Sequence, residues 1–105
     1  MHIQINTDSN IEGKDALARQ VETMVRETLD HFSKHITRVE VHLRDENSGS
    51  KSGTKDKRCL LEVRLTGHQP IAVSHHASTL EQAVDGATKK MKRSLVSTLG
   101  RLDHR

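Results

Sequence analysis

The 105-residue chain is long enough for one domain and too short for two that each have their own core. Only 32% of the residues are hydrophobic and Phe32 is the single aromatic, which predicts a thin core of Leu, Val, Ile and Met and excludes base-stacking platforms. The net charge of +3 is unevenly placed: residues 1–50 hold six Lys and Arg against nine Asp and Glu, and residues 51–105 hold eleven against five. This asymmetry makes a polyanionic partner plausible.

Targeting and cysteine signals are lacking. No apolar run is long enough to cross a bilayer, and the start "MHIQINTDSN" lacks the layout of a secretory signal, so we expect a cytoplasmic protein with no membrane partner. The single Cys59 cannot form an internal disulfide, and no Cys-x-x-Cys spacing points to zinc. We therefore predict that Cys59 is a small buried hydrophobe.

The first half of the chain predicts a strand, a helix and a second strand. Ile3 and Ile5 alternate with polar residues, which indicates a strand over 2–6. From 14 to 34, apolar residues recur every three or four positions, which predicts an amphipathic helix. The positions are Leu17, Val21, Met24, Val25, the semi-polar Thr28 and Phe32. Alternation returns in "TRVEVHLRDE", so we expect a second strand over 37–46.

The second half begins with a loop. The segment "NSGSKSGTKDK", residues 47–57, has no periodicity and predicts a mobile loop. Strands are expected over 58–66 and 71–76, joined by a turn at "GHQP". The tetrapeptide "STLE" from Ser78 to Glu81 fits a capping box, which predicts a long helix from there to about 102.

The resulting order, β-α-β-β-β-α, predicts an α+β fold. Each strand has one apolar face, so we expect a four-stranded sheet with both helices on one face and a single domain over residues 1–105. The residues predicted to be buried are Ile3, Ile5, Leu17, Val21, Val25, Phe32, Val39, Val41, Leu61, Val63, Ile71, Val73, Val84, Met91 and Leu95.

The last helix carries a cationic cluster opposite its predicted core stripe. At 100° per residue, the stripe falls within about 80° and has Thr98 as its one polar member. Its positions are Val84, Ala87, Met91, Leu95, Thr98 and Leu102. Lys89, Lys92 and Arg93 project away from it, at about 180°, 120° and 220°, and Lys90 lies near the boundary, where its ammonium can reach water. Arg19 and Arg26 project outward on the first helix, among acidic neighbours.

These charges admit two interpretations. The first is a solvated helix face, as charge runs commonly are. However, no acidic residue lies between Gly86 and Gly100, and like charges such as Lys89 and Arg93 repel at this spacing, so helix stability alone does not favour them. Without aromatic residues on the sheet, contacts would go to phosphate and ribose, which points to a structured RNA recognised by its shape.

The segment "GHQPIAVSHHASTLEQAVDGATKKMKRSL" resembles the family of ribosome hibernation promoting factors and ribosome-associated inhibitors, the sigma-modulation-type proteins. The family helix has the pattern A-I/V-D-x-A-x-x-K-L/M-x-R-x-L. Here it stands as Ala83, Val84, Asp85, Ala87, Lys90, Met91, Arg93 and Leu95. The ending "VSTLGRLDHR" carries only Arg101 and Arg105, where family members continue with more lysines. We expect no further domain of the long-form type.

The resemblance implies a fold similar to a double-stranded RNA-binding domain and a non-enzymatic, short-form hibernation factor. Its partner would be the small ribosomal subunit, whose 16S-type rRNA it would bind in the mRNA–tRNA channel, with no cofactor and no small-molecule substrate. Off the ribosome the protein would be a monomer. The residues expected to bind rRNA are Lys89, Lys90, Lys92, Arg93, Arg101, Arg19 and Arg26.

Three alternatives remain open. A general structured-RNA binder without a ribosome role would use the same basic helix. A protein-interaction module would use the wet sheet face, whose charges are mixed in sign. The eight histidines make a metal site or an enzyme the third alternative. His31 and His35 are spaced to bind one ion, but Glu27 lies two turns from His35, too far for all three to converge. We therefore expect no metal site.

Overall fold

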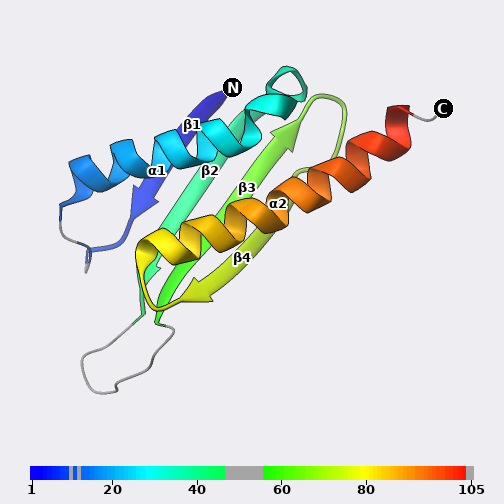
Figure 1. The fold of residues 1–105 in the computed structure, drawn as a ribbon. Helices are drawn as coiled ribbons and strands as arrows, with labels where there is room; N and C mark the ends of the chain where they lie inside the picture. The colour runs from blue at the N-terminus through cyan, green and yellow to red at the C-terminus, as the bar shows by residue number, and fades with distance from the viewer. Residues whose placement is uncertain (10, 12, 47–55, 104–105) are drawn as a thin grey trace.

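The computed structural model describes residues 1–9, 11, 13–46 and 56–103, with side chains up to Gly100. Its elements follow the predicted β-α-β-β-β-α order (Figure 1). They are β1 (His2–Thr7), α1 (Lys14–Leu29), the 3-10 helix η1 (Asp30–His35), β2 (Ile36–Asp45), β3 (Lys57–Leu65), β4 (Ile71–Ala77) and α2 (Leu80–Asp103). The predicted loop at 47–57 lies, except for its last two residues, outside the described residues.

The four strands form one mixed sheet in the order β1-β2-β3-β4. β1 and β2 are parallel, with Ile3 opposite Val39 and Ile5 opposite Val41, and the other neighbours are antiparallel. Because parallel neighbours need a crossover, α1 lies between these two strands in the chain. Gly67 makes the tight connection from β3 to β4 with a φ of 74°, a value that favours glycine.

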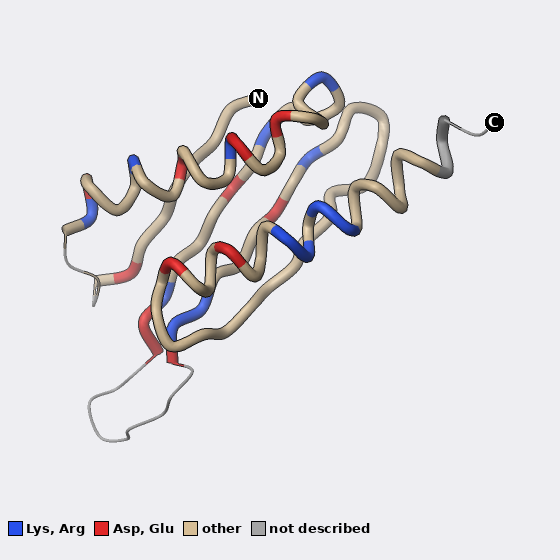
Figure 2. Tube along the Cα trace, viewed as in Figure 1, with Lys and Arg blue, Asp and Glu red and all other residues tan. Residues whose placement is uncertain are grey.

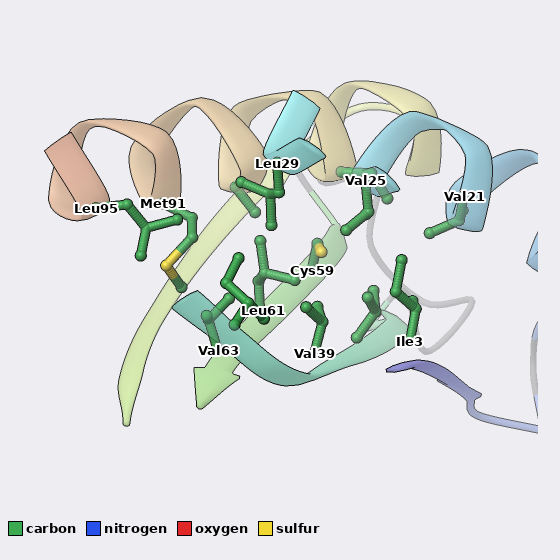
Figure 3. Close-up of a cluster of buried hydrophobic side chains, with 14 of the residues drawn as sticks. Ile3, Val21, Val25, Leu29, Val39, Cys59, Leu61, Val63, Met91 and Leu95 are labelled. Atoms are coloured by element: carbon green, nitrogen blue, oxygen red, sulfur yellow. The ribbon is translucent and has the colours of Figure 1, made fainter. Parts of the chain in front are cut away.

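Both helices cover the same face of the sheet, as predicted (Figures 1 and 3). Val39 and Val41 of β2 and Leu61 and Val63 of β3 are completely buried against them. Cys59 is also buried, and desolvation raises the pKa of its thiol to about 12, which confirms its predicted role as a small hydrophobe. No helix among the described residues is long and apolar enough to span a membrane.

The core differs from the prediction at its margins. Four residues expected to be buried are only partly so, although all pack against the core: Ile5, Leu17, Ile71 and Val73. Three of them lie on β1 or β4, the outer strands, which have a neighbouring strand on one side only. The structure also buries residues that were not expected there: Ile11, Leu29, Ile36, Ala83 and Leu99.

The first predicted helix changes type before it ends. Its α-helical part stops at Leu29, and residues 30–35 continue as η1. The 3-10 geometry rises more steeply and has fewer residues per turn, so it redirects side chains within a short distance. It buries Phe32 and ends where the N–H of Ile36 donates to the carbonyl of Ser33, immediately before β2.

The cap of α2 lies one residue later than predicted. Thr79 Oγ1 accepts the N–H of Gln82 at 3.1 Å, so the capping pair is Thr79 and Gln82 instead of Ser78 and Glu81. Glu81 instead accepts a hydrogen bond from Gln20 of α1 at 3.1 Å. The tetrapeptides that begin at Ser78 and at Thr79 both fit the capping-box pattern. β4 continues to the buried Ala77, so Ser78 lies in the bend and Thr79 is the residue directly before α2.

The buried stripe of α2 also differs at its polar member. Thr88 is buried and donates to the carbonyl of Val84 at 2.6 Å, whereas Thr98 is half-buried. Beyond Leu95 the stripe continues through Leu99, and the side chain of Leu102 lies outside the described residues. At 100° per residue, Thr88 and Leu99 lie just beside the predicted stripe on the same side of it, so the buried face of α2 is rotated slightly toward them.

The cap assignment predicts different effects at two adjacent residues. Thr79→Ala should lower the free energy of unfolding by about 1 kcal/mol, because the N–H of Gln82 loses its acceptor. Ser78→Ala is the matched control and should change stability by less than about 0.5 kcal/mol. Urea denaturation of both variants measures this. A larger loss for Ser78→Ala would show that the cap is wrongly assigned.

Candidate nucleic-acid interface

The middle of α2 presents three exposed cations, which we call the α2 ridge: Lys89, Lys92 and Arg93. Positions three and four residues apart are neighbours on a helix surface, so the three side chains form one patch. Met91 and Leu95 on the opposite side are completely buried. Figure 2 shows blue segments in the middle of α2 that follow the red ones near its start. The structure therefore confirms that the ridge points away from the core.

One member of the ridge has an acidic partner. Lys89 Nζ lies 3.0 Å from Asp85 Oδ2, one turn earlier, whereas the sequence analysis treated the ridge charges as unpaired. That interpretation was wrong for Lys89, because its i, i+4 partner Asp85 lies just before Gly86. The pair is more than half exposed, and such a pair contributes less than about 1 kcal/mol. Lys89 can therefore exchange this partner for a phosphate at little cost.

Lys90 differs from the ridge residues because it is tied to the sheet. It is half-buried, and its Nζ donates to the carbonyl oxygen of Ser74 on the edge strand β4 at 2.8 Å. The predicted position at the boundary of the buried stripe is confirmed, and the ammonium has a backbone acceptor as an additional partner. Lys90 thus anchors α2 to β4 and helps to set the direction of the ridge.

The two arginines of α1, Arg19 and Arg26, lie near acidic side chains. Arg26 forms an exposed ion pair of 3.5 Å with Glu22. Gln20, next to Arg19, donates to Glu81 in the first turn of α2, so this part of α1 lies beside the acidic end of α2. Glu81 precedes Lys89 by eight residues, or about 12 Å of helix. Figure 2 shows the alternation of both signs along α1. The side chain of Arg101 is outside the described residues.

A cleft of about 800 Å³ extends the basic surface from α2 to η1. Lys92 and Val96 line it from α2, and His31, Lys34 and His35 line it from η1. Val96 is 55% exposed and is the one large hydrophobic residue on the described surface with such exposure. The sequence analysis missed Lys34, because no local pattern relates the end of the first helical segment to a helix more than fifty residues later.

The adjacent histidines of β4 face opposite sides of the sheet, as expected for a strand. His76 is exposed and its Nε2 lies 3.0 Å from Glu46 Oε1. His75 lies beneath α2, since a Cβ atom added to Gly86 would be only 2.1 Å from its ring. Gly86 therefore permits the close approach of α2 to β4, one turn before Lys90 reaches Ser74.

The profile of a family described as "Sigma 54 modulation protein / S30EA ribosomal protein" matches residues 3–103. The N-terminal domain of Protein Y from Thermus thermophilus has a similar structure, with a TM-score of 0.69 and 22% identity over 90% of this chain and 96% of that chain. A ribosomal subunit interface protein from Coxiella burnetii has a TM-score of 0.70 and 18% identity, over 95% and 99%. No curated protein sequence matches. At these identities the structural similarity supports the α+β fold.

The contact between Gly86 and His75 predicts opposite effects of alanine at two glycines of α2. Gly86→Ala should lower the free energy of unfolding by about 1–3 kcal/mol, because the added methyl group displaces the imidazole. Gly100→Ala adds a methyl group where no atom lies within 4 Å, so it should be neutral or stabilise by up to about 1 kcal/mol.

Chemical denaturation of both variants and of Gly86→Ala in a His75→Ala background measures the coupling between the two sites. The cost of Gly86→Ala should shrink in that background. Stabilisation by Gly86→Ala equal to that of Gly100→Ala would contradict the close approach.

Proposed function

The chain belongs to the sigma 54 modulation protein / S30EA ribosomal protein family, and on this basis we propose that it binds the ribosome and restrains translation as a hibernation-type factor. The match covers residues 3–103, nearly the whole chain. One similar structure is described as a ribosomal subunit interface protein, which supports the ribosome as the partner. The proposed role is non-enzymatic and cytoplasmic.

The observation that carries the proposal is the exposure of the α2 ridge. Lys89, Lys92 and Arg93 lie on one helix face, backed by buried core, so they can approach a phosphate backbone together. Neutralising phosphates releases counterions and makes binding depend on salt. Such contacts position the protein but carry little sequence information. A large folded RNA is therefore a suitable partner.

We assign this interface to rRNA of the small subunit, in the channel that mRNA and tRNA would occupy. The helix pattern that places Lys90 and Arg93 in the family register supports this assignment. Occupation of the channel by the folded domain would exclude mRNA and tRNA sterically. Arg19, Arg26 and Arg101 would make secondary contacts, and Lys90 would act mainly by holding α2 against β4.

The cleft beside Lys92 adds one residue to the proposed interface. Lys34 and Lys92 line the same cleft from different elements, so an RNA backbone along α2 would meet both. This arrangement favours an RNA partner over a protein partner on the sheet. On the outer sheet face, four charged or titratable side chains of β2 and β3 already contact one another: Arg38, Glu40, His42 and Glu62.

The ridge predicts a loss of ribosome binding without a loss of stability. Changing Lys89, Lys92 and Arg93 together to Ala should weaken ribosome pelleting at least tenfold and flatten the salt dependence by about one unit per lost contact. The melting temperature should stay within a few degrees, since all three residues are exposed. Pelleting at two salt concentrations, beside a thermal melt, measures both effects.

The control is a triple variant with the same change in charge at exposed positions elsewhere: Lys14, Arg44 and Arg64 to Ala. It should pellet nearly like the parent protein. If both triple variants weaken ribosome binding equally, the α2 ridge contributes only general charge attraction. If the ridge variant does not weaken ribosome binding, the proposal loses its basis.

Lys34 gives a prediction that arises from the tertiary structure alone. Lys34→Ala should weaken pelleting severalfold, and its effect should be smaller in a Lys92→Ala background if the two lysines contact neighbouring phosphates. Lys14→Ala is a matched single control. Equal effects of Lys34→Ala and Lys14→Ala would exclude the cleft from the interface.

A further inference from the structure

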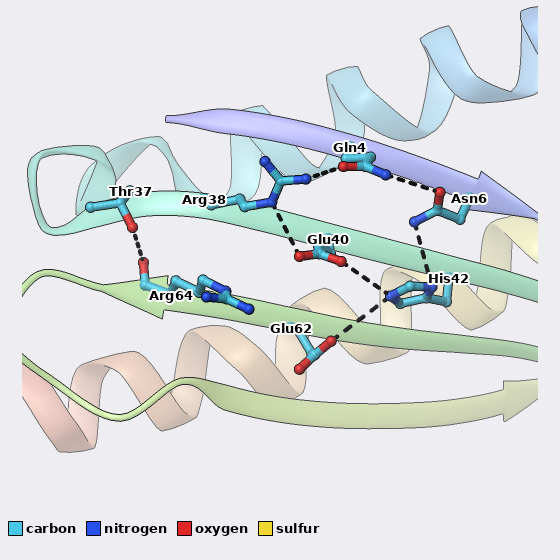
Figure 4. A network of polar contacts seen from close by, with 8 residues as sticks. All are labelled: Gln4, Asn6, Thr37, Arg38, Glu40, His42, Glu62 and Arg64. Carbon is cyan, nitrogen blue, oxygen red and sulfur yellow. Dashed lines mark hydrogen bonds and ion pairs between the residues drawn. The ribbon is translucent and has the colours of Figure 1, made fainter.

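The outer face of the sheet holds three side chains of metal-ligating type that the proposed function does not use. Glu40 and His42 project from β2 on the same side, because side chains two residues apart share a face. Glu62 of β3 is the direct cross-strand partner of Glu40. Figure 4 shows the imidazole of His42 in contact with both carboxylates. No other group of three such side chains comes together in the described part of the chain.

The three ligand atoms converge on one small volume. His42 Nε2 lies 3.7 Å from Glu40 Oε1 and 3.8 Å from Glu62 Oε1. All three atoms lie within 4.8 Å of one another. Bond lengths of about 2.1 Å in a tetrahedral zinc site place ligand atoms about 3.4 Å apart. Side-chain rotations that move each ligand atom by less than about 1 Å would therefore close the group around an ion.

The negative charges of Glu40 and Glu62 favour a cation at this position. Like charges directly opposite on neighbouring strands destabilise a sheet, and Glu40 and Glu62 are directly opposite. Arg38 Nε lies 3.1 Å from Glu40 Oε2, the oxygen that faces away from His42. That contact offsets part of the negative charge but leaves Oε1 of both glutamates directed at the imidazole nitrogen.

Further polar contacts hold the ligands in place. Asn6 Nδ2 lies 3.5 Å from His42 Nδ1, the nitrogen that would not bind the ion. Gln4 connects the ends of this network, since its Nε2 donates to Asn6 Oδ1 at 3.2 Å and its Oε1 accepts from Arg38 (Figure 4). Metal-binding sites are typically built in this way, with outer hydrogen bonds that orient the imidazole and the carboxylates. Rotation of the Asn6 amide would present its oxygen to the Nδ1 proton of a coordinated His42, at the cost of the hydrogen bond from Gln4.

We propose that Glu40, His42 and Glu62 bind one divalent transition-metal ion of the Zn²⁺ or Mn²⁺ class. The imidazole nitrogen favours such ions over Ca²⁺ and Mg²⁺, which prefer oxygen ligands only. The three side chains are 23–41% exposed, so the remaining coordination positions face solvent and can hold water or a group from a partner. The ion would join β2 to β3 on the face opposite the helices.

The probe is Zn²⁺ alone, with Co²⁺ as a spectroscopic substitute, added to the full chain. Calorimetric titration should give one tight equivalent, and the melting temperature should rise by roughly 5 °C or more at a hundredfold excess over Kd. Co²⁺ should show visible absorption bands of a low-coordinate site. His42→Gln should weaken binding at least tenfold and abolish these bands, and Glu62→Gln should weaken binding by a similar factor.

The matched control is His76→Gln. His76 also lies beside a glutamate, with its Nε2 3.0 Å from Glu46 Oε1, but belongs to no converging group of three in the described residues. This variant should bind Zn²⁺ like the parent chain. The proposal is overturned if no tight equivalent is found, if His42→Gln and Glu62→Gln both bind like the parent, or if His76→Gln loses binding as strongly as they do.

Discussion

The single-sided burial of β2 and β3 is the constraint on which the other features of this protein depend. Val39 and Val41 on one strand, and Leu61 and Val63 on the next, are completely buried and lie opposite one another in register. Alternation places every second residue on the other face, where it must meet water. Burial of about 25 cal/mol per Å² of apolar surface makes a reversal of this arrangement unfavourable, so both helices must cover the same face.

The covered face determines what α2 can present. Its apolar stripe is committed to the core, so the cations that follow at three- and four-residue spacing face solvent. Two contacts set how closely α2 approaches β4. Gly86 allows α2 to come close to His75, and Lys90 reaches the backbone of β4 one turn later. The ridge is therefore an exposed surface on a helix whose rotation is fixed by its buried side, which is a suitable basis for binding a rigid RNA.

The open face of the sheet has a different character. Its polar side chains, from Gln4 on β1 to Glu62 on β3, contact one another in a chain of hydrogen bonds and ion pairs. The two proposed binding surfaces thus lie on opposite sides of the domain and use different chemistry. One gathers cations of α2 and η1 for phosphate, and the other gathers two carboxylates and an imidazole that a cation would neutralise. A change at one surface need not disturb the other.

The sequence by itself determined the order of the elements, the single-sided core and the outward direction of Lys89, Lys92 and Arg93. These follow from periodicity within one segment, which can be counted along the chain. The Lys89–Asp85 ion pair could also be predicted from the sequence, because its two residues are one helical turn apart.

The tertiary structure alone decided which features come together across segments. The choice of Thr79 as cap, the bond from Lys90 to Ser74, and the meeting of Lys34 with Lys92 depend on how α2 packs. The convergence of the Glu40 and Glu62 carboxylates on His42 depends on the register of β2 against β3. Register and packing are set by side chains distant in sequence, whose fit has no local periodic signature.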